Sequence, residues 1–318
     1  MISESRQIPG TEELNIKEEF KLRYQKLLGS EYEKFMQYST SFIRRSIRVN
    51  TLKIGVEELA GRLQADWKLD RVPWCNEGFW IKGERLDIGN LPEHVLGYFY
   101  VQEAASMIPP VVLEPKPGEV CLDMCAAPGS KTTQMAAMMQ NEGIIVANDI
   151  SGERIKALGL NLNRTGVSNA VIAHTAGSQL SKLKIRFDRI LVDAPCSATG
   201  TIRRNLKVLQ MYNYSTVNRL ASMQKGLITR AYGLLKEGGT LVYSTCSMEP
   251  EENEGVVTHL LEKEDSAAVE KIGLPLERSA CYTEFDEAEY DSRVKDCLRI
   301  WPQDNNTEGF FVARIRKV

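Results

Sequence analysis

The sequence lacks the features that would place it in a membrane or outside the cell. No apolar run approaches the ~18 residues that a membrane-spanning helix requires. The first residues, MISESRQIPGTEEL, do not combine a basic start with an apolar stretch, as a secretory signal does. We therefore expect a cytoplasmic protein that does not act at a membrane.

The sequence also lacks excess positive charge and a disulfide framework. It has 40 Lys and Arg against 42 Asp and Glu residues, a formal net charge of −2, so any binding of nucleic acid must come from local basic segments. Seven cysteines, an odd number spread widely through 318 residues, favour free thiols over disulfide bonds.

Two of these cysteines have similar surroundings, each where an apolar strand should end. Cys196 lies in VDAPCSATGT, and Cys246, fifty residues later, lies in VYSTCSMEPEENE. We interpret the glutamates of the second segment (Glu249, Glu251, Glu252 and Glu254) as the first turn of a helix, favoured by its dipole. Active sites of open α/β sheets collect at strand ends, so both thiols are candidate functional groups.

From residue 119 onward, short apolar segments alternate with amphipathic helical ones. The expected strands are EVCLDM, GIIVAND, AVIAH, FDRILVDA and GGTLVYST, and the expected helices cover about 131–140, 151–164, 217–235 and 251–262. This alternation is typical of βαβ units and of a parallel, doubly wound sheet. The final segment, LRIWPQDNNTEGFFVARIRKV, predicts two strands joined by a polar turn, which would end the sheet in an antiparallel pair.

The first hundred residues have a different pattern. Residues 13–28 and 30–36 have helical periodicity, SIRVNTLKI alternates as a strand does, and GVEELAGRLQA is helical. We expect a small α/β domain over 1–96 and a larger α/β domain over 97–318, with the proline-rich MIPPVVLEPKPGE near the joint.

The segment VCLDMCAAPGSKTTQMA predicts a strand, a loop of small residues and a helix start. Such a loop lets a ligand approach backbone N–H groups at the helix N-terminus. The triphosphate pattern G-x-x-x-x-G-K-[ST] is broken, because Met124 stands at its first glycine and Ser130 separates Gly129 from Lys131. The dinucleotide pattern G-x-G-x-x-G is reduced to Gly129 alone.

S-adenosylmethionine is the third candidate ligand for this loop. It needs donors at the helix N-terminus and an acid at the end of the next strand to accept hydrogen bonds from ribose hydroxyls. Asp149 in VANDISGER supplies that acid. The alternative interpretation is that Asp149 only caps the helix that begins near Ser151.

Three motifs, DMCAAPGSKTTQ, DAPCSATGTIRRN and YSTCSMEPEENE, resemble in this order those of the Sun-type (NSUN) family of RNA cytosine-C5 methyltransferases. The similarity extends to SIRVNTLKI, GYFYVQEAASMIPPVVLEPKPGE and TEGFFVARIRK, so it covers roughly residues 20 to 318. The compact chain is most similar to the archaeal tRNA-modifying members. The resemblance implies a Rossmann-like class I S-adenosylmethionine-dependent methyltransferase domain, preceded by a small α/β RNA-binding domain of the RRM-like kind.

The resemblance also implies roles for individual residues. Cys246 would be the nucleophile, and Cys196 would help to release the product. Asp193 and Lys131 would border the target base and the methionine end of the cofactor. The other cofactor-binding positions would be Cys125, Ala126, Ala127, Pro128, Gly129, Ser130, Asp149 and Arg154.

Three positions depart from the family pattern. The acid that usually ends the third strand and binds the adenine amino group is replaced by Ala176, which leaves Thr175 or Ser178 for this contact. Leu206 replaces the proline that usually follows RRN, and Gln303 stands where a histidine often occurs. The lost acid is the only support for the alternative of a non-catalytic RNA-binding scaffold.

The chemistry of cytosine methylation explains why these residue types are needed. Carbon 5 becomes nucleophilic only after a thiolate adds to carbon 6. A cysteine suits this step because its pKa of ~8.5 falls readily beside positive charge. A carboxylic acid, Asp193, would relieve negative charge at N3, and Cys196 would assist when the carbon 5 proton leaves and the thiol is expelled.

Two basic segments without acids, IRRSIRVNTLK and TGTIRRNLK, are the candidate RNA contacts, because Lys and Arg bind phosphates without reading sequence. The alternative is an ordinary solvated surface. The candidate side chains are Arg44, Arg45, Arg48, Arg203, Arg204 and Lys207. We expect a monomeric enzyme that acts on tRNA, with rRNA as the alternative substrate.

A zinc-binding module is the rival hypothesis from another class of protein. Its ligands would be Cys121, Cys125, Cys196 and Cys246. A C-x-x-x-C spacing across a strand end with distant partners does not match zinc-ribbon spacing. We therefore expect no metal.

Overall fold

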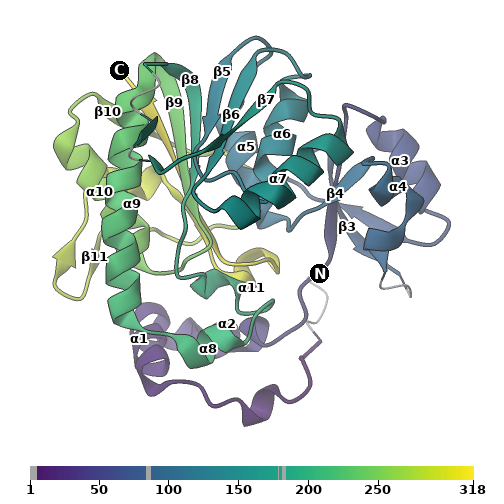
Figure 1. The fold of residues 1–318 in the computed structure, drawn as a ribbon. Coiled ribbons are helices and arrows are strands. Elements are labelled where there is room, and N and C mark those ends of the chain that lie inside the picture. The colour runs from purple at the N-terminus through teal and green to yellow at the C-terminus, as the bar shows by residue number, and fades with distance from the viewer. Residues whose placement is uncertain (1–5, 84–86, 178, 181–183) are drawn as a thin grey trace.

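Two separate β-sheets with helices around them form the core of the protein. The computed structural model describes residues 6–83, 87–177, 179–180 and 184–318 (Figure 1). The larger sheet has the strand order β10-β14-β9-β8-β5-β6-β7 and the smaller one the order β2-β3-β1-β4. Within the described ranges, no helix combines the length and the apolar character that crossing a membrane requires.

The larger sheet is parallel over most of its width. Its parallel strands are β5 (Val120–Asp123), β6 (Ile144–Asp149), β7 (Ala170–His174), β8 (Phe187–Asp193) and β9 (Leu235–Thr245). All five match the expected strands. β14 (Phe310–Lys317) runs antiparallel between β9 and β10 (Ala267–Glu270), and β13 (Leu298–Ile300) pairs with β14. The expected antiparallel pair is therefore confirmed, with the short helix α11 (Pro302–Asn305) inside its connection.

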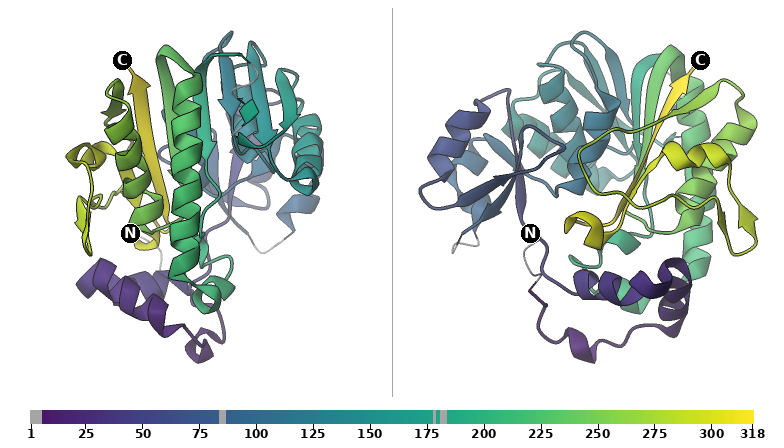
Figure 2. Two further views of the ribbon diagram at one scale, coloured as in Figure 1. Left: turned by 60° about the vertical axis from the view of Figure 1, so that its left-hand side comes forward. Right: turned by 180° about the vertical axis from the view of Figure 1, so that it is seen from behind.

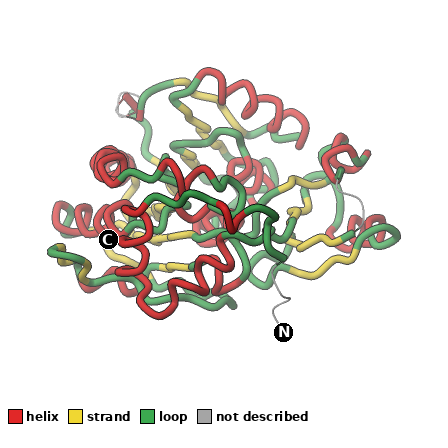
Figure 3. Tube along the Cα trace, turned by 90° about the horizontal axis from the view of Figure 1, so that it is seen from below, coloured by secondary structure: helices red, strands yellow, loops and turns green. Residues whose placement is uncertain are grey.

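Helices cover both faces of this sheet, as the view from below shows (Figure 3). On one side lie α9 (Tyr214–Leu234) and α10 (Glu254–Lys263), and on the other lie α5 (Ile108–Leu113), α6 (Ser130–Met138) and α7 (Gly152–Thr165). The chain therefore forms the expected doubly wound, Rossmann-like α/β domain.

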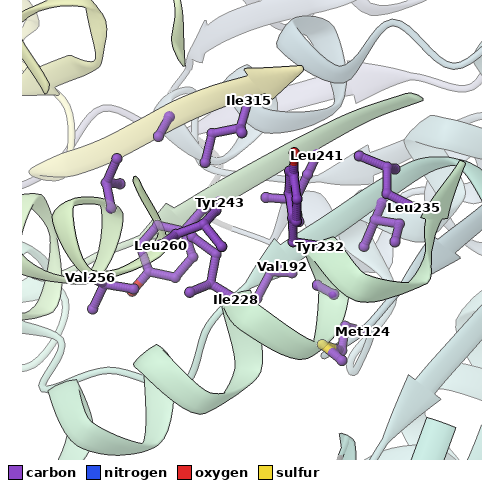
Figure 4. Close-up of a cluster of buried hydrophobic side chains, with 14 of the residues drawn as sticks. Met124, Val192, Ile228, Tyr232, Leu235, Leu241, Tyr243, Val256, Leu260 and Ile315 are labelled. Carbon is purple, nitrogen blue, oxygen red and sulfur yellow. The ribbon is translucent and has the colours of Figure 1, made fainter. Parts of the chain in front are cut away.

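Successive strand residues alternate between these two layers, because side chains along a strand point to opposite faces. Ile190 and Val192 of β8 pack with α9 and α10, whereas Leu191 between them packs with α5 and α6. Figure 4 shows the cluster on the side of α9 and α10, in which Tyr243 of β9 lies near Ile228 of α9. Because every layer is apolar, the strands are held in place from both sides and their carboxyl ends form a fixed edge.

The smaller sheet is antiparallel and has the βαββαβ order of an RRM-like domain, as expected. Its elements are β1 (Ser46–Val49), α3 (Val56–Leu63), β2 (Lys68–Arg71), β3 (Gly78–Lys82), α4 (Pro92–Val95) and β4 (Phe99–Val101). β4 pairs with β1, so a boundary at residues 96 and 97 would separate β4 from the sheet that it completes.

The first two helices, α1 (Glu18–Leu28) and α2 (Tyr32–Ser39), do not belong to this small domain. Their buried residues Tyr24 and Phe35 pack edge-on against Trp301, in a cluster that also includes Met248. Figure 2 shows both helices beneath the larger domain, next to α8 (Lys207–Met211) and the lower end of α9. The expected domain over 1–96 therefore combines two parts that pack differently, because residues before about 40 pack into the core of the larger domain.

Candidate active site

Four strands of the larger sheet end in polar residues along one edge. β5 ends at Asp123, β6 at Asp149, β8 at Asp193 and β9 at Thr245, immediately before Cys246. In open α/β sheets, ligands bind outside this carboxyl edge. The topology thus collects Asp149, Asp193 and Cys246, which the sequence predicted from three distant segments, and places Asp123 beside them.

The two cysteines lie in contact. The Sγ atoms of Cys196 and Cys246 are 3.3 Å apart, within hydrogen-bond distance for sulfur. The segments that carry them also meet at Gly200, whose N–H donates to the Cys246 carbonyl at 2.8 Å. A Cβ on Gly200 would lie 2.3 Å from the Gly309 carbonyl oxygen, so only glycine allows this close approach.

The two thiols differ in their surroundings. A hydrogen bond with Cys246 and burial raise the pKa of the Cys196 thiol well above its ordinary value. Cys196 therefore holds its proton at neutral pH and can donate it in a hydrogen bond to the Cys246 sulfur.

Lys131 and Asp193 form an ion pair beside Cys246. Lys131 Nζ lies 2.7 Å from Asp193 Oδ2, and Ser244 Oγ donates to Asp193 Oδ1 at 2.8 Å. Burial lowers the pKa of Lys131, but the Asp193 carboxylate outweighs this effect and leaves it raised. The pair is thus a buried ammonium next to a carboxylate that only accepts hydrogen bonds.

The small-residue loop lies between β5 and α6 and contacts Asp149. Asp149 Oδ2 accepts from Ala127 N at 3.2 Å, and Arg154 Nη1 lies 3.3 Å from the same oxygen. Asp149 Oδ1 accepts from Ser151 N, so the alternative role in starting α7 is also present. Gly129 has a φ of 107°, which other residues rarely adopt, and a Cβ there would press on Leu158.

This loop fits the methionine and ribose groups of S-adenosylmethionine. Asp149 has a carboxylate that accepts hydrogen bonds from N–H donors and could accept them equally from ribose hydroxyls. Asp123, which the sequence analysis did not select, is fully buried and its Oδ1 has no partner within the described part of the chain. Ile150 is 68% exposed directly after Asp149, an apolar surface of the kind that a ring packs on. Thr175 is partly exposed, and Ser178 lies outside the described residues.

A cavity of about 500 Å³ brings both domains together over Cys246. Among the described residues, Cys246 lines it and Cys196 does not. Lys131 and Asp193 line it too, together with Tyr100 of β4. The other lining residues include Arg44, Arg45, Glu103, Pro128, Ser130, Arg204, Glu308 and Phe310.

Two of the six predicted RNA-binding residues are not available to RNA. Arg48 is 2% exposed, and its Nη1 and Nη2 donate to Gln102, Ser130 O and Thr133, joining β1 to α6. Arg203 is 4% exposed and donates to backbone carbonyls of the segments around residues 42 and 307. Both predictions are wrong, because these guanidinium groups are buried and donate to groups inside the protein.

The other four basic residues remain candidates. Arg44, which lies over the Trp80 ring, Arg45 and Arg204 line the cavity. Arg204 is exposed and lies 3.4 Å from Glu308. Lys207 is exposed on α8. The set of basic residues that RNA could reach is therefore smaller than the sequence predicts.

The glutamate run after Cys246 is not a solvated first turn of a helix. Glu249, Glu252 and Glu254 are each 0% exposed. Glu249 and Glu251 bind Arg23 of α1, and Glu254 binds the buried Arg299. The alternation of these acids with apolar residues in SMEPEENEGVV is typical of a helix surface, and their buried partners lie far away in the sequence.

The seven cysteines are free thiols, as expected. Cys121 is buried in β5, and burial raises its pKa to about 12 and raises that of Cys125 as well. Across the part of the chain that the structure describes, no group of three or more His, Cys, Asp or Glu side chains is arranged to hold a metal ion.

Comparison with known proteins gives consistent matches along the chain. Residues 110–316 match the family described as 16S rRNA methyltransferase RsmB/F, and residues 16–104 match the N-terminal domain of 16S rRNA methyltransferase RsmF. A tRNA (cytosine(49)-C(5))-methyltransferase of Pyrococcus abyssi is 47% identical over 96% of this chain and 99% of its own length. A methyltransferase homologue from Pyrococcus horikoshii, a solved structure, has a TM-score of 0.87 at 38% identity, covering 96% of this chain and 97% of that chain.

The ribosomal RNA relatives are longer proteins. The ribosomal RNA small subunit methyltransferase F of Aeromonas salmonicida is 43% identical over 86% of this chain, but the match covers only 58% of that protein. The chain thus spans less than two thirds of the length of this relative.

Proposed function

We propose, because the chain belongs to the 16S rRNA methyltransferase RsmB/F family, that it transfers a methyl group from S-adenosylmethionine to carbon 5 of a cytosine in RNA. The observation that carries the proposal is the contact between Cys196 and Cys246 at the edge of a cavity that Cys246, but not Cys196, lines. A thiolate facing a cavity next to a proton-donating lysine suits addition to carbon 6 of a pyrimidine.

The cofactor would be held by the loop 125–131, by Asp149 and by Arg154, with Lys131 and Asp193 at its methionine end. Bound there, S-adenosylmethionine supplies an electrophilic methyl group on a sulfonium. Thr175 is the proposed contact for the adenine, since Ala176 has no polar side chain. The buried Asp123 supports the proposal, because its unpartnered oxygen leaves an acceptor near the same loop.

The chain's own groups would perform the remaining steps. Cys246 Sγ adds to carbon 6, and Lys131 Nζ donates a proton or hydrogen bond to relieve charge at N3. Asp193 keeps Lys131 protonated, which differs from the direct proton donation that we expected of Asp193, because its carboxylate already accepts two hydrogen bonds. After the methyl group joins carbon 5, water in the open cavity accepts the carbon 5 proton, and the electrons of that C–H bond form the double bond to carbon 6. The bond from carbon 6 to sulfur breaks with its electron pair returning to Cys246, and any proton on N3 returns to Lys131.

Cys196 would assist this last step. Its thiol lies against the Cys246 sulfur and can stabilise the departing thiolate by a hydrogen bond. This role agrees with the position of Cys196 outside the lining of the cavity, because its thiol needs to reach the Cys246 sulfur and not the cytosine.

The proposed substrate is tRNA, with rRNA as the alternative. The tRNA-modifying relative matches this chain over nearly its whole length, whereas the rRNA-modifying relative has a further part that this chain does not match. Arg44, Arg45 and Arg204 would bind phosphates next to the flipped cytosine, which must leave its stack to reach the thiol.

The test is methylation of unmodified tRNA and of a small-subunit rRNA fragment by the full chain with labelled S-adenosylmethionine, followed by bisulfite sequencing. We expect 5-methylcytosine in tRNA and none with the Cys246→Ala variant. Methylation of the rRNA fragment alone would overturn the choice of tRNA, and no incorporation into either RNA would overturn the proposed activity.

A further inference from the structure

The two thiols are chemically identical, yet the proposed function gives one of them the role of nucleophile and the other the role of proton holder. We propose that Glu252 makes them different: its carboxylate, bound to the N–H and hydroxyl of Ser197 directly after Cys196, keeps the proton on Cys196. The catalytic roles of the two thiols rest on the proposed function, but the effect of Glu252 on the proton of Cys196 does not.

Glu252 ends a short 3-10 helix, Pro250–Glu252, and binds the residue after each cysteine. Its carboxylate accepts from Ser197 N at 3.0 Å and from the Ser197 hydroxyl. The same group accepts from Ser247 Oγ at 2.8 Å. One carboxylate therefore fixes the segments of both cysteines relative to each other.

Gln224 of α9 completes the arrangement around Cys196. Its Nε2 donates to Pro195 O at 2.8 Å and to Glu252 Oε2 at 2.7 Å. The residues before and after Cys196 are thus both tied to the same pair of side chains. The distance between Cys196 and the Glu252 carboxylate is set by these bonds.

The charge of Glu252 is not neutralised by an ion pair. Within the described ranges, Glu249 and Glu251 are paired with Arg23, and Glu254 is paired with Arg299, but Glu252 has no cationic partner. Its partners are hydroxyl, amide and peptide groups that donate to it, as they do to an ionised carboxylate. Burial raises the pKa of Glu252, and the hydrogen bonds from Ser197, Ser247 and Gln224 oppose this effect.

The other ionisable groups near the pair do not compensate this charge. Lys131 and Asp193, on the cavity side of Cys246, are paired with each other, so their charges largely cancel. The Tyr243 hydroxyl donates to the backbone oxygen of Glu252 at 2.6 Å, and burial keeps it neutral by raising its pKa. Glu252 adds to the hydrogen bond and the burial that raise the pKa of Cys196.

Glu252 is therefore a positioning residue: it does not line the cavity and acts through the two cysteines. The hydrogen bonds from Ser197 and Ser247 to Glu252 would by themselves only position the two sulfur atoms. The unpaired charge of Glu252 also favours the protonated form of the Cys196 thiol, because a nearby negative charge disfavours a second one.

The test measures the pH dependence of alkylation of Cys196 by iodoacetamide in the full chain, without RNA or cofactor. In the Cys246→Ala background, peptide mass spectrometry follows Cys196 separately from the other five cysteines. Glu252→Gln should lower the pKa of Cys196 and raise its alkylation at a fixed pH by at least about threefold, the effect of half a pKa unit. With both cysteines present, the same substitution should shift alkylation from Cys246 toward Cys196.

Glu251→Gln is the matched control, since it removes one negative charge from the neighbouring residue, which faces Arg23. It should leave the Cys196 profile unchanged. Glu252→Asp keeps the charge and should keep Cys196 within about twofold of its parent rate, well inside the tenfold change of one pKa unit.

An unchanged Cys196 profile in Glu252→Gln would overturn the inference and leave Glu252 with a purely structural role. Should that variant not remain folded by circular dichroism, Glu252→Asp decides instead, and a threefold rise in Cys196 alkylation with this charge-preserving variant would contradict the inference. Neither readout uses methyl transfer, so failure of the proposed function would be seen separately in the RNA assay.

Discussion

The Sγ atoms of Cys196 and Cys246 lie 3.3 Å apart, although one cysteine follows β8 and the other follows β9. The two strands are parallel neighbours in register, with Asp193 opposite Ser244, so their carboxyl ends meet. Both sulfur atoms can therefore act in one reaction cycle on a single base.

The first prediction concerns the covalent intermediate. Cys246→Ala should abolish methylation and form no adduct, because the base is never activated. Cys196→Ala should accumulate a protein–RNA adduct, because the bond to carbon 6 forms but the departing thiolate loses its hydrogen-bond donor. Denaturing electrophoresis with labelled tRNA measures the adduct. An adduct in Cys246→Ala would show that Cys246 is not the nucleophile, and an adduct in the double variant would show that neither cysteine is.

A second prediction tests the cofactor loop. Asp149→Ala should weaken binding of S-adenosylmethionine by roughly tenfold to a hundredfold, as expected for the loss of hydrogen bonds to a charged group worth about 1.5–3 kcal/mol. Isothermal titration calorimetry measures the affinity. The control is Asp188→Ala at the opposite end of β8, where the carboxylate binds Lys236 and Val120 N. Equal affinities of Asp149→Ala and the parent would remove Asp149 from the site.

Adjacent arginines provide the third prediction. Arg204→Ala should weaken RNA binding and reduce its salt dependence by about one phosphate contact, with a stability change below ~1 kcal/mol for its exposed ion pair. Arg203→Ala should instead destabilise the fold by roughly 3 kcal/mol, since it leaves the carbonyls of Phe42 and Thr307 without donors. Thermal melting and filter binding at several salt concentrations separate the two effects, and a shared phenotype would contradict this division.

The fourth prediction concerns pH. Burial raises the pKa of Asp123 to about 7. The folded protein thus holds this proton more tightly than the unfolded chain, and the resulting stability is present below about pH 4 and lost as the pH rises through 7. Asp123→Asn cannot ionise, so without cofactor it should gain about 2 kcal/mol relative to the parent between pH 5 and pH 8.

Asp188→Asn is the control for this experiment. A hydrogen bond and an ion pair with Lys236 lower the pKa of Asp188 against the opposing effect of burial. Its contribution is fully present above the unfolded pKa, so the difference between variant and parent should stay constant from pH 5 to pH 8. A constant difference for Asp123→Asn as well would show that Asp123 is ionised in the fold at pH 5.

The sheet could be predicted from the sequence because its signal is local. FDRILVDA is apolar over consecutive residues, and β8 packs on both faces. The carboxyl-edge residues Asp149, Asp193 and Cys246 followed from these strands. The contact between the two sulfur atoms depends on neighbouring strands and on Gly200, and no local pattern specifies it.

Burial of charged residues could not be predicted, because it depends on partners that lie far away in the sequence. Arg203 and Arg204 look alike in sequence, but the acceptors of Arg203 come from segments more than a hundred residues away on either side. Glu252 is similar, because its partners Ser197 and Gln224 lie 55 and 28 residues earlier. Such residues are satisfied by the tertiary structure, which the composition of a short segment does not contain.

Because α1 and α2 pack on the larger domain, these helices, which are synthesised first, can complete their packing only late in translation. Phe20, Tyr24 and Phe35 leave the ribosome first, but Met248 and Trp301, which share their cluster, are made more than two hundred residues later. At ~5–20 residues per second, these aromatic side chains wait for their partners for roughly 10 to 60 seconds. The RRM-like domain can fold during translation, whereas the cluster around α1 and α2 is complete only after Trp301 has emerged.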